Sequence, residues 1–72
     1  MHDHFAERIK WCQEMREAAT RQLSRIEDDG WRFHAGAGNA PMRDVTDEIA
    51  DRERRTIANM TKLIAGYEAR DA

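Results

Sequence analysis

Apolar side chains recur at steps of three and four along two long segments, and this spacing is typical of amphipathic helices. In the first segment, over about residues 3–29, these positions are Phe5, Ile9, Cys12, Met15, Leu23 and Ile26, with Ala19 filling the gap. In the second, over about residues 44–70, they are Val45, Ile49, Thr56, Ile57, Met60, Leu63, Ile64 and Tyr67. The alternation expected of a β-strand fits neither segment. The pattern therefore predicts an all-α chain whose two helices are joined by a loop over residues 30–43.

The loop begins with a helix-ending signal and carries two aromatic side chains. Gly30 stands where a glycine in the left-handed conformation ends a helix in the Schellman motif, and this motif places Trp31 against Ile26. Trp31 and Phe33 favour burial. We expect them to cover the open end of the helix pair, in preference to binding a ligand.

The start of the second helix has two possible positions. Asp44 can cap the helix with its side chain, whereas a start just before Pro41 is the alternative. The helix dipole disfavours Asp28 and Asp29 at the end of the first helix and Arg43 near the start of the second. A hairpin brings these charges together, so we expect Arg43, alone or with Arg32, to pair with Asp28 or Asp29.

Antiparallel folding about the loop places the two apolar stripes in register. Ile9 then faces Ile64, and Leu23 faces Ala50. Gly66 lies inside the second segment, where a glycine costs about 1 kcal/mol relative to alanine. Close approach of the first helix would explain this glycine, and fraying of the second helix is the alternative.

Two helices cannot cover each other's apolar positions, because each stripe is wider than one line of contact. Trp11, Met15 and Ala18 broaden the first stripe, and the pairs Thr56-Ile57 and Leu63-Ile64 broaden the second. A chain of 72 residues buries only a modest fraction of its surface, and its single cysteine, Cys12, cannot form an intrachain disulfide. We therefore predict that two hairpins pair as a homodimeric four-helix bundle. Trimers, tetramers and a different protein partner fit the same pattern.

The predicted core and dimer seam combines the inward positions of both helices. Its members are Phe5, Ile9, Cys12, Met15, Leu23, Ile26, Ile49, Ile57, Met60, Ile64 and Tyr67.

Both stripes are interrupted by charge near their middle. Arg16 interrupts the first, and the run 52–55 (Arg-Glu-Arg-Arg) interrupts the second. One interpretation is a buried polar layer that fixes the register, as in coiled coils. We prefer the other, in which Arg16 and Arg52 lay their aliphatic stems on the core and extend their charges into water.

Composition and charge narrow the range of partners and compartments. Hydrophobic residues make up 40% of the chain and charged residues 36%, and the net charge of −2 gives no general attraction to nucleic acid or anionic lipid. The start of the chain lacks a basic region followed by an apolar run, and no stretch is long and apolar enough to cross a bilayer. We expect a cytoplasmic protein. The ten arginines against two lysines suggest a GC-rich bacterial genome.

The residues that could support chemistry form weak patterns. His34 near Asp28 and Asp29 resembles a base with an orienting carboxylate, but no nucleophile is placed beside it. His2 and His4 lack the spacing of a helical metal-ligand pair. We therefore predict no catalytic residue, no cofactor and no metal site.

A protein-interaction or regulatory module that self-associates is the function that the sequence favours. The alternative is a small nucleic-acid-associated regulator that uses the segment 52–55. Acidic residues interleave with these arginines and cancel much of their field, so nucleic-acid binding is the weaker hypothesis.

Overall fold

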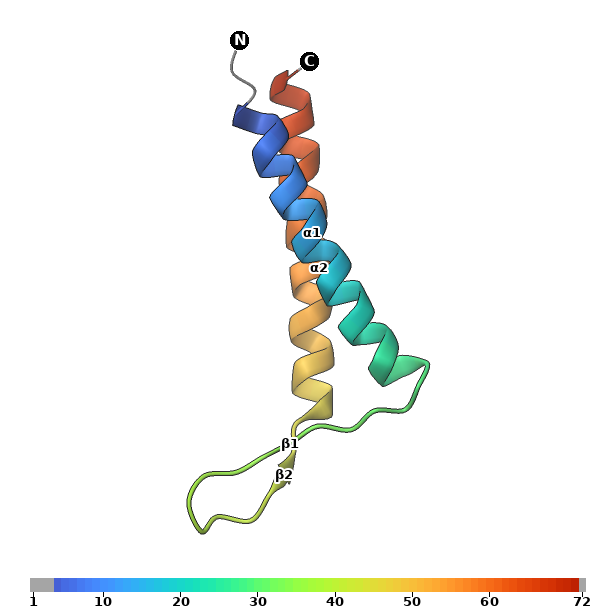
Figure 1. Ribbon diagram of the computed structural model, residues 1–72, viewed down its shortest axis with the longest axis vertical. Helices are drawn as coiled ribbons and strands as arrows, with labels where there is room; N and C mark the ends of the chain where they lie inside the picture. The colour runs from blue at the N-terminus through green and yellow to red at the C-terminus, as the bar shows by residue number, and fades with distance from the viewer. Residues whose placement is uncertain (1–3, 72) are drawn as a thin grey trace.

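The computed structural model describes residues 4–71 as a helical hairpin with a folded arm. The order of elements is α1 (His4–Glu27), β1 (His34–Ala35), β2 (Arg43–Asp44) and α2 (Thr46–Asp71). The two helices pack antiparallel, and the arm that joins them extends beyond one end of the pair (Figure 1). The predicted helix–loop–helix hairpin is confirmed. Within the described residues, α1 ends two residues earlier than predicted, at Glu27, and α2 begins two residues later, at Thr46.

Small side chains form most of the seam between the helices. Cys12 and Ala19 of α1 and Ala50 and Ile64 of α2 are the buried hydrophobic residues of the described chain. The distance between packed helices is set by the side chains at their contact, so two alanines and a cysteine favour close packing. Most of the larger apolar side chains lie beside this seam and are only partly covered.

The predicted antiparallel register is realised at the end of the hairpin away from the arm. The rings of Phe5 and Tyr67 stack with 5.7 Å between their centroids, and the guanidinium of Arg8 lies 5.9 Å from the centre of the Tyr67 ring. The helices lie together at this end and separate toward the arm (Figure 1).

The end of α1 departs in part from the Schellman prediction. Gly30 has a φ of 73°, the predicted left-handed conformation, but the Trp31 amide donates to the carbonyl of Arg25, one residue before the expected acceptor. The Trp31 ring lies 5.2 Å from the Arg25 guanidinium and remains 50% exposed. Trp31 is therefore less covered than expected, and its ring lies against Arg25 at the surface.

The arm contains two short strands that the sequence pattern did not predict. They pair antiparallel with His34 opposite Asp44 and Ala35 opposite Arg43. Two residues are too few to show an alternating pattern. Gly36 permits the arm to close, because a Cβ atom there would lie 3.1 Å from the Pro41 carbonyl oxygen.

Hydrogen bonds of Thr46 and its neighbours connect the arm to the first turn of α2. Its side chain is fully buried and accepts a hydrogen bond of 2.8 Å from the Phe33 amide. The Val45 amide donates to the Phe33 carbonyl at 2.8 Å, and the Thr46 amide donates to Asp44 Oδ1 at 2.9 Å. Asp44 therefore caps α2, which decides between the two predicted starts.

The arginines of the arm pair with carboxylates at the start of α2. Arg32 Nη2 lies 2.6 Å from Asp44 Oδ2, and Arg43 pairs with Glu48. The expectation that Arg43 pairs with Asp28 or Asp29 is thus wrong. Asp28 instead accepts a hydrogen bond of 2.6 Å from the hydroxyl of Ser24, one turn earlier in the chain.

Asp44 gives the arm a pH dependence. Hydrogen bonds from Thr46, and then from Arg32, lower the pKa of Asp44 below its ordinary value. A lowered folded-state pKa means that the carboxylate stabilises the fold above the unfolded value of about 3.9, and that this contribution is lost as the pH falls through the folded value. We expect Asp44→Asn to melt a few degrees below the wild type at pH 7, with the difference shrinking below about pH 4. Thermal melts followed by circular dichroism from pH 7 to pH 3 test this. A difference that stays constant with pH would contradict it.

Gly66 provides a second test of the fold. A Cβ atom at Gly66 would meet nothing within 4 Å, and α2 continues past it to Asp71. Close approach of α1 therefore does not explain this glycine, and fraying of α2 stays a prediction. Gly66→Ala should raise the free energy of unfolding by about 0.5–1 kcal/mol, because alanine loses less backbone entropy in a helix. Urea denaturation measures the change, and a loss of stability would indicate a close neighbour at Gly66 in the assembled protein.

Candidate protein-interaction surface

The hairpin has two unlike faces, and one is crossed by polar bridges between the helices. Arg16 Nη1 donates to Thr61 Oγ1 at 3.2 Å, and Arg54 Nη2 lies 2.7 Å from Glu27 Oε2. The Glu27 carboxylate raises the pKa of Arg54. We call this surface the bridged face. These two contacts link α1 to α2 through polar groups at two levels, so this face is suited to contact with water.

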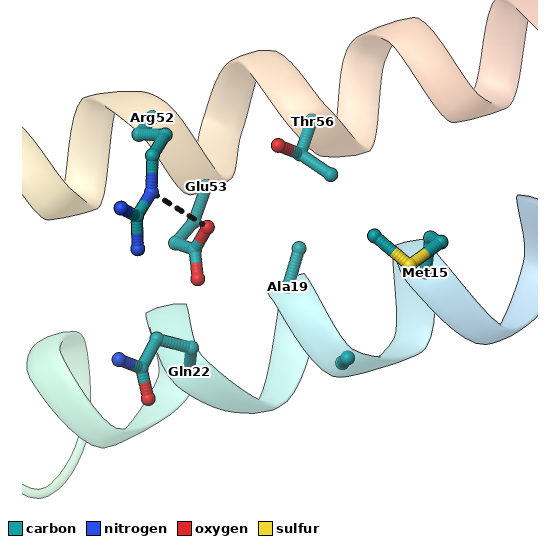
Figure 2. Close-up of a pocket in the computed structure, with 7 residues that line it drawn as sticks. Met15, Ala19, Gln22, Arg52, Glu53 and Thr56 are labelled. Atoms are coloured by element: carbon teal, nitrogen blue, oxygen red, sulfur yellow. Dashed lines mark ion pairs between the residues drawn. The ribbon is translucent and has the colours of Figure 1, made fainter.

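The opposite side carries a groove between the helices, and we call it the groove face. The groove has a volume of about 420 Å³. Its lining residues are Met15, Ala18, Ala19, Gln22, Arg52, Glu53 and Thr56 (Figure 2). Because residues four and seven positions apart share one side of a helix, the wall on α1 continues from Met15 and Ala18 to Trp11. By the same spacing, the wall on α2 continues from Thr56 to Leu63.

Large apolar side chains are exposed along the groove face. Trp11 is 55% exposed, Leu63 is 41% exposed and Met15 is 39% exposed. Single exposed apolar residues are ordinary, but three of them along one groove, two on α1 and one on α2, are typical of an interaction site.

A charged pair lies within this apolar surface. The Glu53 side chain points from α2 toward α1, opposite Ala19 and Gln22 (Figure 2), and only 13% of it is exposed. Arg52 Nε lies 3.6 Å from Glu53 Oε1, while the Arg52 side chain is 63% exposed. This distance is short enough for an ion pair but longer than a hydrogen bond. The carboxylate can therefore still accept hydrogen bonds from another donor.

The structure places the predicted seam residues at three depths. Cys12 and Ile64 are buried, and Met15 is exposed in the groove. The others are half-buried: Phe5, Ile9, Leu23, Ile26, Ile49, Ile57, Met60 and Tyr67. Partial cover of so many large apolar side chains is the expected state of a hairpin that lacks an additional layer.

Glu53 is the residue of this surface that the sequence analysis missed. It follows Ala50 by three positions and precedes Ile57 by four, so the helical spacing does place it on the inward side of α2. Because Glu53 lies within a run of charged residues, the sequence analysis did not assign it to the inward side. For Arg52 and Arg16, the preferred interpretation fits the observed geometry, because Arg52 is mostly exposed and Arg16 is half-buried.

Among the residues that the structure describes, the groups considered for catalysis, metal binding and nucleic-acid binding do not converge on a site. His34 lies in β1, and within residues 4–71 no three His, Cys, Asp or Glu side chains gather around a possible metal position. The prediction about His2 falls outside the described residues, as does the side chain of His4. Arg54 is held by Glu27 and by Asp51 at 2.9 Å, so this part of the segment 52–55 is already paired with acids. Nucleic-acid binding by the segment stays a prediction from sequence.

In the described part of the chain, neither helix combines the length and the apolar character needed to span a membrane. The chain matches no protein-family model, no curated protein and no solved structure with which it was compared.

Proposed function

We propose that this chain is a self-associating protein-interaction module, in which the groove faces of two hairpins pack together as a homodimeric four-helix bundle. The observation that carries the proposal is an excess of exposed surface. The single chain exposes 5626 Å², whereas a compact protein of its mass of 8.4 kDa exposes about 4,600 Å². The difference is roughly 1,000 Å², and one partner in a standard protein–protein interface buries about 800 Å².

The shape of the hairpin explains the excess. The Cα atoms span 55 × 28 × 14 Å, and their radius of gyration is 16.3 Å, against about 11 Å for a compact domain of this length. The molecule is therefore a single layer of helices. Globular domains bury the apolar sides of their elements between at least two layers, and a second hairpin supplies the missing one.

The groove face is the side on which a second copy fits. It presents Trp11, Met15 and Leu63 to water, whereas the other side is bridged by Arg16 and Arg54. A two-fold symmetric interface requires a surface that complements itself. The groove face meets this requirement, because its apolar walls can cover one another and it carries one acidic and one basic side chain.

The activity we propose is assembly rather than a reaction. Pairing through the groove face leaves the bridged faces of both hairpins turned outward, as the polar exterior of a four-helix bundle requires. The arms that extend beyond the helices are available for contact with a further protein.

Leu63→Glu tests the proposal, because it places a carboxylate on the α2 wall of the proposed contact. We expect the wild type to sediment as a dimer. The variant should dissociate, with a rise in dissociation constant of roughly thirtyfold, equivalent to about 2 kcal/mol for a charge buried without a partner. Sedimentation velocity over a range of protein concentrations measures both values.

Ala58→Glu is the matched control, because Ala58 is exposed on the side of α2 that bears Arg54 and Thr61. It adds the same side chain and charge to α2 and should leave the dimer intact. A wild type that remains a monomer at high concentration, with full helicity and a cooperative thermal transition, would refute self-association. Equal weakening by Leu63→Glu and Ala58→Glu would exclude the groove face as the contact.

A further inference from the structure

Glu53 and Arg52 occupy the groove as a pair of opposite charges that is only loosely joined within the chain. The Glu53 carboxylate lies in a mostly covered position with an ion-pair distance of 3.6 Å to Arg52, and the Arg52 guanidinium extends toward water. Packing a second hairpin over this groove would remove water from both groups. A charge buried in an interface without a partner strongly disfavours association, so each group needs an opposite charge on the incoming surface.

We propose that Arg52 and Glu53 form reciprocal salt bridges across the two-fold axis of the dimer, and that these bridges select a second copy of this chain as the partner. The inference rests on the self-association proposed above. In a two-fold symmetric contact, both hairpins present the same residues to each other, so every contact between the two copies occurs twice. Arg52 of one copy therefore faces Glu53 of the other, and the reverse pair forms at the same time.

The position of the groove suits such an exchange. Its walls, at residues 15–22 and 52–56, lie near the middle of the molecule when the arm is included (Figure 1). A two-fold axis along the bundle keeps both grooves at one level, and an axis that crosses the bundle at the groove does the same. Either arrangement brings the two charge pairs together.

The reciprocal pair also explains why charge is retained in an apolar groove. An apolar groove accepts many apolar helix faces in several registers. A carboxylate and a guanidinium at fixed positions instead penalise a partner that lacks the matching charges. The pair therefore acts on the choice of partner and register, more than on the strength of the contact.

Two single charge reversals, tested apart and together, decide the question. Arg52→Glu leaves acidic side chains at both position 52 and position 53 of the groove, and Glu53→Lys leaves basic ones at both. Each variant alone should therefore repel its own copy. We expect the dissociation constant of each homodimer to rise at least about tenfold at low salt. An equimolar mixture should form a heterodimer of near wild-type affinity, because the introduced lysine meets the introduced glutamate across the axis. Sedimentation equilibrium measures the affinities, and native mass spectrometry identifies the heterodimer by mass.

Matched controls carry the same charge changes on outward positions of the helices. Arg55→Glu and Glu14→Lys alter the net charge equally at exposed positions outside the groove and should dimerise as the wild type does. Circular dichroism of every variant separates lost association from lost folding, and a variant that unfolds alone should regain helicity on mixing with its complement.

The outcomes separate this inference from the function on which it rests. A dimeric wild type whose two charge reversals also remain tight homodimers would overturn the reciprocal pair and leave self-association standing. Two dissociated variants that form no heterodimer on mixing would overturn it as well. A wild type that stays monomeric would overturn both proposals.

Discussion

A pair of helices shares only one line of contact, and the rest of this structure depends on that geometric constraint. The seam buries Cys12, Ala19, Ala50 and Ile64, which are mostly small, and it leaves the larger apolar side chains on the flanks. A hairpin gains most of its stability from covering apolar surface. Whether the single hairpin or an assembly is the stable form therefore depends on how much apolar surface its two flanks leave exposed. The two flanks differ in this respect: one is polar and the other is apolar.

On the bridged face, long polar side chains reach across from one helix to the other. Exposed ion pairs such as that of Arg54 with Glu27 contribute little net stability, so they make this flank compatible with water without holding the helices together. On the groove face, no comparable bridge spans the described residues that line the groove. The apolar walls there make the groove face the flank that benefits from an additional layer.

The sequence predicted those parts of the structure that depend on local spacing. Helical periodicity located both helices to within two residues at the loop ends, and the left-handed Gly30 followed from helix-ending chemistry. The arm was not predictable in this way, because its strands are two residues long and are fixed by contacts of Thr46 with Phe33, thirteen residues away. The ion pairs of Arg32 and Arg43 were missed for the same reason, since they depend on how the arm folds back. The spacing of Glu53 was readable, but its inward position was hidden within a run of charges.

A carboxylate at the inward position of Glu53 affects both the stability of the hairpin and, on the proposal above, its choice of partner. An apolar side chain at this inward site would extend the seam, and replacing buried charges with apolar groups is often neutral or stabilising. Retaining a carboxylate beside Arg52 therefore gives up stability that the small hairpin core could use. On the reciprocal-pair proposal, the compensation is recognition, because only a surface with the complementary charges at the same level can close over the groove. The same two residues would then leave the single hairpin marginal and make its own copy the favoured partner, which couples folding of the module to its assembly.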